Sequence, residues 1–248
     1  MHSTTSLLEV SRLFWDRDTK VLPAQVGLER TRVETRADLY EYNLDHIHQI
    51  KDTYFPFYTP LVSKFWPLDQ KDAVIVDRIF IDLDVRLVTE KDPVSGEEVQ
   101  RKTTIEEIWS KGKLFYDNFW PNIELFFSGG KGFHIYLYIL PTAMGELRQS
   151  RERMYAVFST WFQYLLDKKA FLSLDRICRT TLTRHSIDSG HPTLPKWKVP
   201  ISPTMELPEI LREATHPRQF TDHFMNLYRR RPEPVDYRIF LRSPHELL

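Results

Sequence analysis

Two aspartates, Asp82 and Asp84, lie one residue apart inside the apolar stretch FIDLDV. In a β-strand, residues i and i+2 point to the same face, so both carboxylates should project together from a strand over 78–85. Two carboxylates this close repel each other unless a cation lies between them, and Mg²⁺ and Mn²⁺ favour such oxygen ligands. The simpler interpretation is a polar strand end with Arg78 or Arg86 as the counter-ion, because a DxD pattern is common by chance.

The turn SGGKGFH at 128–134 uses three of the eight glycines in the chain. Glycine adopts positive φ easily and lets other groups approach the backbone, so the segment predicts a hairpin turn between two strands. A hairpin does not explain the hydroxyl, the ammonium and the imidazole that accompany the glycines. Converging on exposed backbone N–H groups, these side chains would form an anion site suited to a triphosphate. The residues of this cluster are Ser128, Gly129, Gly130, Lys131, Gly132 and His134.

The segment 172–201 (LSLDRICRTTLTRHSIDSGHPTLPKWKVPI) is the densest in functional residue types. It carries two acids, Asp175 and Asp188, together with three arginines and two histidines. A solvated, proline-rich surface segment is the simpler interpretation. However, Arg184 and His185 are followed by a Ser-Gly turn and a return strand, WKVPI, which could bring their cations to the same pocket.

Apolar periodicity predicts the elements that must position these clusters. From their β-branched and apolar runs, strands are expected at 72–85, 123–127 and 133–140. Helices are expected at 3–17, 38–52, 103–119, 150–169, 207–214 and near 220–230. Thr104, with Glu107 three residues later, forms a capping-box pattern at the start of one of these helices. The sequence therefore predicts an α+β protein built on a mostly antiparallel sheet.

The composition narrows the class of protein. One cysteine, Cys178, excludes an internal disulfide and a multi-cysteine zinc site. No apolar run approaches the ~18 residues needed to span a bilayer, and the N-terminus lacks a signal-peptide pattern, so we expect a cytoplasmic protein. The net charge is zero, but acids gather at 90–107 and bases at 176–198 and 228–231, which is compatible with a single basic groove.

The order of the three clusters resembles the archaeo-eukaryotic primase superfamily: hDhD, then SGGKGFH, then an LDR acid upstream of RHS, SG and VP. The resemblance covers residues 55–201 and is greatest with the compact primase-polymerases of plasmids and mobile elements. It implies that two catalytic Mg²⁺ or Mn²⁺ ions are bound by Asp82, Asp84 and Asp175. It also implies that the phosphates of the incoming nucleotide are held by Ser128, Lys131, His134 and Arg184.

We assign the three glycines of the turn and His185 to the same nucleotide site. Asp175 is preferred to Asp188 as the third metal ligand, because it follows the apolar run FLSL, which can place it on the sheet. The fold that the resemblance implies is an N-terminal α/β lobe packed on an RRM-like sheet that carries the active site. We expect a single catalytic domain over 1–248, with lobes at 1–75 and 76–248.

The activity implied is template-directed nucleotidyl transfer, which adds nucleotides to a 3′-hydroxyl on a single-stranded DNA template by a two-metal mechanism. The expected partners are the DNA template and primer, dNTPs or NTPs, and a downstream helical module or helicase, with no membrane and no zinc. Because the chain ends at Leu248, soon after the core, we expect primer extension rather than initiation. Template contacts are expected from Lys196, Trp197, Lys198, Arg229, Arg230 and Arg231.

Three other interpretations stay open at this point. A metal-dependent nuclease would also cluster acids, although the Ser-Lys-His turn suits a triphosphate better than a bare phosphodiester. A non-catalytic RRM-like module would bind single strands through aromatic residues on its sheet, but acids on that face would repel phosphate without metal. A purely structural domain would leave the three clusters as coincidence. The sequence leaves the choice between dNTPs and NTPs, the oligomeric state and the pathway undetermined.

Overall fold

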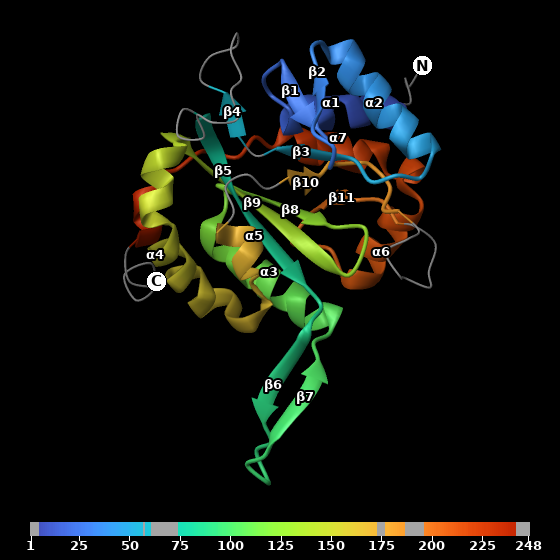
Figure 1. The fold of residues 1–248 in the computed structure, drawn as a ribbon. Coiled ribbons are helices and arrows are strands. Elements are labelled where there is room, and N and C mark those ends of the chain that lie inside the picture. The colour runs from blue at the N-terminus through green and yellow to red at the C-terminus, as the bar shows by residue number, and fades with distance from the viewer. Residues whose placement is uncertain (1–4, 57, 61–73, 173–176, 187–195, 242–248) are drawn as a thin grey trace.

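The computed structural model describes residues 5–56, 58–60, 74–172, 177–186 and 196–241. Its centre is a five-stranded sheet in the order β11-β8-β9-β5-β4, in which all neighbouring strands are antiparallel (Figure 1). The strands are β4 (Tyr58–Pro60), β5 (Val74–Asp84), β8 (Ile123–Phe127), β9 (Gly132–Ala143) and β11 (Val199–Ile201). The predicted α+β class and the antiparallel sheet are therefore confirmed, while the likeness to an RRM stays a prediction.

One face of this sheet is apolar and is covered by helices. The odd-numbered side chains from 79 to 83 in β5, from 123 to 127 in β8 and from 133 to 137 in β9 point to it, and buried members include Ile81, Ile135 and Leu125. Three helices pack on this layer (Figure 1): α3 (Ile105–Phe119), α4 (Met144–Phe162) and α5 (Lys168–Leu172). Burial of these side chains makes the main hydrophobic core, which holds the two long strands in place.

The N-terminal segment lies against the other face of the sheet. Phe55 packs edge-on to Tyr136 of β9, and Arg78 of β5 donates to the carbonyl oxygens of Arg17 and Asp18. The elements of this segment are α1 (Leu7–Asp18), β1 (Ala24–Val26), β2 (Thr31–Val33), α2 (Arg36–His48) and β3 (Tyr54–Pro56). They have a small core of their own, made of Trp15, Ala24, Val26, Val33 and Leu39. Strand β3 pairs with β10 (Ile177–Arg179), which ties the segment to the later chain.

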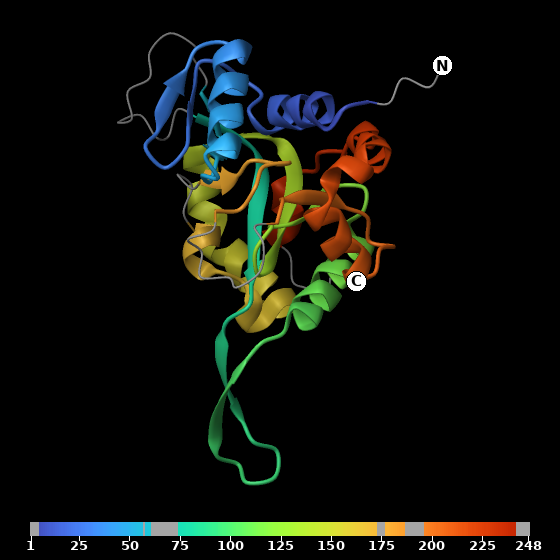
Figure 2. The ribbon, with the colours of Figure 1, turned by 90° about the vertical axis from the view of Figure 1, so that its right-hand side faces the viewer.

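A hairpin of β6 (Leu87–Lys91) and β7 (Glu98–Lys102) projects away from the body of the protein (Figures 1 and 2). The sequence predicts only the turn at its tip, because the flanking residues are polar and lack a one-sided apolar pattern. Val94 at this tip is 95% exposed, so the end of the hairpin makes almost no contact with the rest of the chain.

The base of the hairpin is held firmly. Arg86 N donates to Thr103 Oγ1 at 3.0 Å, and Thr103 N donates to the carbonyl oxygen of Arg86 at 2.9 Å. Above this pair, Arg101 bridges Glu90 of β6 and Glu107 of α3 with distances of 2.7–2.9 Å. The same Glu107 accepts in the capping box with Thr104, so the predicted helix start is confirmed and also anchors the hairpin.

The remaining helices follow the sheet along the chain. They are α6 (Leu207–Thr215) and α7 (Thr221–Arg229), close to their predicted positions. The helix predicted at 150–169 is instead α4, which begins at Met144 and ends at Phe162, where Gln163 adopts a φ of 52° and stops it. Among the described residues, no helix combines the length and apolar character that crossing a bilayer requires.

One buried acid makes the stability of this fold depend on pH. Glu213 of α6 is 5% exposed, and one of its carboxylate oxygens has no hydrogen-bond partner. Burial raises the pKa of Glu213 to about 7. Arg212 opposes this rise only in part, and His223 Nε2, 3.9 Å away, adds little because burial lowers the pKa of His223. The folded state therefore favours the protonated carboxyl.

We predict that Glu213→Gln raises the Tm at pH 8 by a few degrees and changes it little at pH 5. In the unfolded chain this carboxyl ionises near 4.5, so folding loses stability as the pH rises from 4.5 towards 7 and does not regain it above 7. Each kcal/mol corresponds to about 2–4 °C in a chain of this size. Thermal melts at both pH values, with the exposed Glu152→Gln as control, would measure the difference. Equal shifts at the two pH values would contradict it.

Candidate functional site

The pairing of β5 with β9 brings the first two sequence clusters together. In this register Asp82 lies opposite His134, and Asp84 lies opposite Gly132. Side chains opposite each other in an antiparallel pair share one face, with Cβ atoms about 4.5–5.5 Å apart. The carboxylate pair and the glycine turn, which are more than forty residues apart in the chain, therefore meet at one end of the polar face of the sheet.

A cavity of about 170 Å³ opens at this point. It is lined by six residues that the sequence predicts for the site: Asp82, Asp84, Ser128, Lys131, His134 and His185. It is also lined by five residues that the sequence interpretation did not assign to the site: Tyr54, Phe80, Ile177, Cys178 and Arg179. Part of the third cluster thus joins the first two, as expected for His185.

Each carboxylate of the pair faces one nitrogen across the cavity. Asp82 Oδ1 lies 3.6 Å from His134 Nε2, and Asp84 Oδ2 lies 3.6 Å from Lys131 Nζ. Both distances are too long for hydrogen bonds. The Asp84 side chain is 31% exposed and that of Lys131 is 52% exposed, so this pair lies at the opening, while Asp82 is deeper at 17%. Neither of these two contacts is therefore a close ion pair.

The oxygen donors present fit one Mg²⁺ or Mn²⁺ ion. Two carboxylates on one strand face are the usual protein share of a magnesium site, with water and substrate phosphates as the other ligands. Within the described ranges, no group of three or more His, Cys, Asp or Glu residues is arranged to hold a metal. Asp175, the predicted third ligand, lies outside the described residues, two positions before Ile177 of the cavity wall.

Ser128 organises the glycine turn rather than leaving its backbone open. The Ser128 hydroxyl oxygen accepts from the N–H groups of Gly130 and Gly132, each at 3.3 Å, and Ser128 N donates to the carbonyl oxygen of Gly132 at 3.0 Å. Two of the N–H groups expected to face a phosphate are therefore engaged inside the turn. This corrects the expected anion cradle: the described polar groups that face the cavity are mainly side chains.

Close approach explains why the turn needs its glycines. A Cβ on Gly132 would lie 2.0 Å from the carbonyl oxygen of Leu83. Gly129 has a φ of 84°, and a Cβ there would lie 2.9 Å from the carbonyl oxygen of Lys196. A Cβ on Gly130 would lie 2.9 Å from the ring of His185. The turn is thus pressed against β5 on one side and against the third cluster on the other.

His134 is a buried neutral imidazole. It is 8% exposed, and its ring packs edge-on to Phe80 with centroids 5.0 Å apart. Burial, together with the nearby charges of Lys198, Arg179 and His185, holds the pKa of His134 well below its usual value. At neutral pH the ring therefore carries one proton, and the position of that proton decides what it offers to the cavity.

The hydrogen bonds among Lys198, Tyr136, Cys178 and His134 assign that proton to Nε2. The Lys198 ammonium has three N–H donors and three acceptors around it: Tyr136 Oη, Cys178 Sγ at 3.4 Å and the carbonyl oxygen of Arg179 at 2.7 Å. Tyr136 Oη then donates to Cys178 Sγ, 3.1 Å away. Cys178, already an acceptor, uses its S–H on His134 Nδ1 at 3.4 Å. Nε2–H consequently points to Asp82 and the cavity.

The thiol stays protonated in this arrangement. Burial raises the pKa of Cys178 to about 11, above the usual range of a thiol. Lys198 itself is fully buried, with its ammonium 4.6 Å from the ring centres of both Phe126 and Tyr136. The predicted template contact of Lys198 is therefore wrong, because an enclosed ammonium with all three donors engaged cannot reach a phosphate backbone.

Arg179 is one of the three arginines of the third cluster, and it lines the cavity although the sequence interpretation gave it no role in the site. Its guanidinium pairs with Asp52, and Asp52 also accepts from Ser186 N at 2.8 Å and from the Ser186 hydroxyl at 3.1 Å. Burial alone would raise the pKa of Asp52, but Arg179 and the Ser186 N–H lower it below its usual value. This clamp fixes the chain beside His185. Asp52 lies 127 residues upstream of Arg179, so the sequence around Arg179 gives no local sign of this ion pair.

The other predicted residues lie outside the cavity. Arg184, predicted to hold phosphate, instead stacks on Trp197 at 5.8 Å and forms a β-bridge with it. Lys196 and Trp197 are partly exposed beside the glycine turn, whereas Arg229, Arg230 and Arg231 are exposed at the end of α7. The predicted template residues therefore fall into two separate groups.

In comparisons with known proteins, no family model matches the chain, and no curated protein matches it either. The assignment of a function therefore depends on the geometry of the cavity and on the order of its motifs.

We predict that Gly132→Ala destabilises the protein by about 2–3 kcal/mol, more than Gly130→Ala does. The new methyl group at 132 meets the backbone of β5, which can yield only by loosening the β5–β9 pairing. At 130 it meets the side chain of His185, which can rotate away. Urea unfolding of both variants would measure the difference, and equal losses would contradict this account of the turn.

A second prediction concerns the tautomer of His134. ¹⁵N NMR of histidine-labelled protein at pH 7.5 should find Nε2 protonated and Nδ1 unprotonated. Cys178→Ser keeps a donor to Nδ1 and should preserve this pattern, whereas Cys178→Ala removes the donor and should give a mixture of tautomers. A wild-type spectrum with the proton on Nδ1 would refute the assignment. Thermal melts of both variants would control for loss of fold.

Proposed function

We propose that this protein is a template-directed nucleotidyltransferase of the archaeo-eukaryotic primase type, which adds nucleotides to the 3′-hydroxyl of a primer. The observation that carries the proposal is the cross-strand pairing of Asp82 with His134 and of Asp84 with Gly132. Through it, a carboxylate pair and a Lys-His turn line one cavity. This is the arrangement that the order of motifs in the sequence leads us to expect.

Asp82 and Asp84 would hold the divalent ion, because they are hard oxygen donors that project from one strand face into the cavity. When bound, Mg²⁺ or Mn²⁺ supplies a Lewis acid that lowers the pKa of a coordinated hydroxyl and neutralises phosphate charge. A second ion would need a further ligand, for which Asp175 remains our proposal. In the free protein the two acids repel each other, so metal binding should also relieve a local electrostatic cost.

The remaining side chains of the cavity suit a triphosphate. Lys131 is half exposed at the opening and provides a flexible positive charge. His134 presents a neutral Nε2–H donor from a fixed position on β9, and its buried partners hold that orientation. Arg179 and His185 add basic groups on the wall that faces the glycine turn. Donors and cations on both sides of the carboxylates match a chain of phosphates better than a single phosphodiester.

The size of the cavity limits which part of the nucleotide enters it. A volume of about 170 Å³ is below the roughly 300–1,000 Å³ of sites that enclose a drug-sized ligand. We infer that the phosphate end is held inside while the base stays outside, where a template strand can pair with it. Lys196 and Trp197, partly exposed beside the turn, are the nearest of the proposed template contacts.

Primer extension tests this function. With a labelled primer on a single-stranded DNA template, wild-type protein should add nucleotides when Mg²⁺ or Mn²⁺ is present and not in EDTA. Asp82→Asn and Asp84→Asn should each lose activity by at least about 100-fold, because each removes a metal ligand. The exposed Asp117→Asn in α3 should retain full activity as the matched control.

Two outcomes would overturn the proposal. Extension by Asp82→Asn within a few-fold of wild type would remove the carboxylates from the chemistry. Metal-dependent cleavage of the DNA in the absence of nucleotides, lost in Asp82→Asn, would instead assign the cavity to a nuclease. Circular dichroism melts of all variants in metal-free buffer would separate loss of activity from loss of fold.

A further inference from the structure

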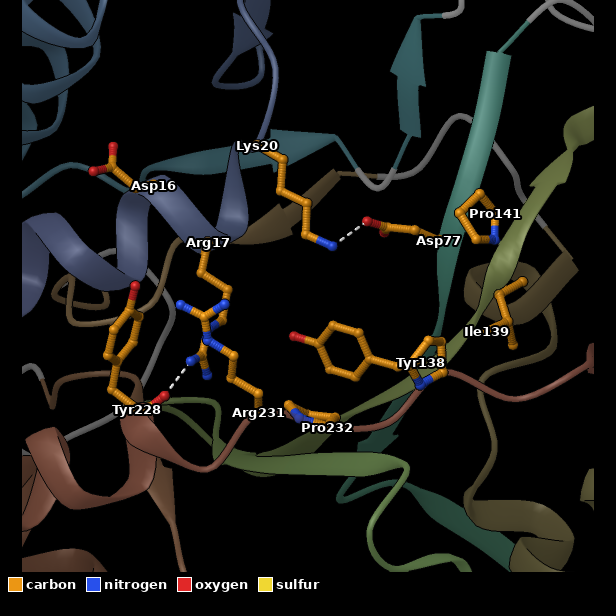
Figure 3. A pocket seen from close by; sticks show the side chains of 11 residues that line it. Asp16, Arg17, Lys20, Asp77, Tyr138, Ile139, Pro141, Tyr228, Arg231 and Pro232 are labelled. Atoms are coloured by element: carbon orange, nitrogen blue, oxygen red, sulfur yellow. Dashed lines mark hydrogen bonds and ion pairs between the residues drawn. The ribbon is translucent and has the colours of Figure 1, made fainter.

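A second and larger cavity, of about 370 Å³, lies further along the same face of the sheet. Its wall is formed by the end of α1, by β5 and β9, and by the chain that follows α7 (Figure 3). Its volume falls within the roughly 300–1,000 Å³ typical of small-ligand sites. None of the metal or nucleotide residues discussed above belongs to it.

Three basic side chains line this cavity. Arg17 is anchored from behind, since one terminal nitrogen pairs with Glu124 and the other donates to the carbonyl oxygen of Tyr228. Only two of its five N–H groups are used in this way among the described residues. Lys20 is 41% exposed, and Arg231 is exposed and has no ion pair within the described ranges. Arg17 is thus rigid, whereas Lys20 and Arg231 can adjust to a ligand.

The acids near the cavity are already engaged. Asp77 is paired with both Lys20 and Arg78, which together hold the pKa of Asp77 below its usual value although burial opposes this. Asp16 accepts from the Tyr40 hydroxyl at 2.7 Å and lies 3.4 Å from Arg36. Among the charged residues that line the cavity, the two acids, Asp16 and Asp77, are outnumbered by three bases, Arg17, Lys20 and Arg231. Within the described ranges Arg231 has no ion pair, so its charge is left for a ligand.

The rest of the wall is aromatic and apolar. The Tyr138 side chain projects into the cavity towards Arg17, and the Lys20 ammonium lies 5.6 Å from the centre of the Tyr138 ring (Figure 3). The Tyr228 ring is covered on one side by the Arg17 guanidinium at 4.1 Å. The apolar wall is completed by Ile139, Pro141, Pro232 and Pro234. Proline and tyrosine surfaces suit a flat ring, and the basic groups beside them suit a phosphate attached to it.

The two cavities are separate. His134 and Tyr138 lie four residues apart on β9, which corresponds to about 13 Å along a strand. Between them the sheet face is closed by Phe80, Tyr136 and Arg78, with exposures of 7%, 0% and 3%, and Phe55 packs over Tyr136. A single strand therefore cannot run along the sheet from one cavity to the other, so the occupant of the larger cavity is a discrete molecule.

We propose that this cavity binds a nucleoside monophosphate, or an aromatic phosphate of similar size, independently of divalent metal. The ring lies against the tyrosine and proline wall, and the phosphate lies between Lys20, Arg17 and Arg231. This site goes beyond the proposed transferase activity and does not depend on it, because none of its residues lines the carboxylate cavity; Arg231, predicted as a template contact, is here assigned to the monophosphate instead.

Calorimetric titration with AMP in EDTA tests the proposal, because EDTA keeps the carboxylate site without metal. Wild-type protein should bind one AMP with a submillimolar Kd. Lys20→Gln and Arg231→Gln should each weaken this binding about fivefold to tenfold, as expected for loss of one charged contact to phosphate. Lys131→Gln, the matched loss of an exposed lysine at the other cavity, should leave the Kd unchanged. Adenosine and ribose 5-phosphate should each bind at least tenfold more weakly than AMP.

Four outcomes would overturn it. These are no heat of binding at 1 mM AMP, loss of binding in Lys131→Gln but not in Arg231→Gln, ribose 5-phosphate binding as tightly as AMP, and an unphosphorylated 15-nucleotide strand binding more tightly than AMP through Lys20 and Arg231. The last would assign the cavity to a nucleic-acid backbone. Arg231 is exposed and has no ion pair in the part of the chain that the structure describes, so its replacement should not unfold the protein, and thermal melts would verify this.

Discussion

The antiparallel register of β5 with β9 is the constraint on which the rest of the structure depends. Because side chains alternate along a strand, a slip of β5 by one residue would carry Asp82 to the apolar face under α3 and α4 and away from His134. The apolar residues of the odd positions would then face the cavity. The large core on the helical face therefore determines, by the same pairing, where the polar residues of the site must lie.

The other face of the sheet is unusual in burying charge. Arg78, Lys198 and Asp18 are all nearly inaccessible, and Glu124 lies beside them behind Arg17. Such groups are costly to remove from water, and they are tolerated here because each is held by several hydrogen bonds or opposite charges. Burial raises the pKa of Asp18, while Lys198 and Arg78 act against that rise. The network leaves little freedom for the strands, which keeps His134 and Tyr138 in fixed positions at the two cavities.

Elements with a strong one-sided pattern could be predicted from the sequence. IELFF coincides with β8, and the Thr104 capping box begins α3 as expected. The sequence also places the carboxylate pair and the glycine turn at strand ends, which suffices to suggest a common site. It cannot supply the pairing of Asp82 with His134, because the register between distant strands leaves no local signature.

The residues that were misplaced or missed share another physical reason. Lysine is rarely fully buried, so nothing in the segment KWKVP indicates that Lys198 lies under His134. Arg179 and Arg184 are similar in sequence context, yet Arg179 pairs with Asp52, which directs it to the cavity, and Arg184 stacks on Trp197. Side-chain direction in such segments is decided by partners that come from far along the chain.

The hairpin of β6 and β7 continues directly from β5, the strand that carries the two carboxylates. It leaves the body two residues after Asp84, and its free length is about 17 Å, five residues at strand spacing. At its root the hairpin is held by the mutual hydrogen bonds of Arg86 and Thr103 and by the ion pair of Arg101 with Glu107. The tip of the hairpin is therefore open to a neighbouring molecule, while these contacts at its root keep the carboxylate of Asp84 in position.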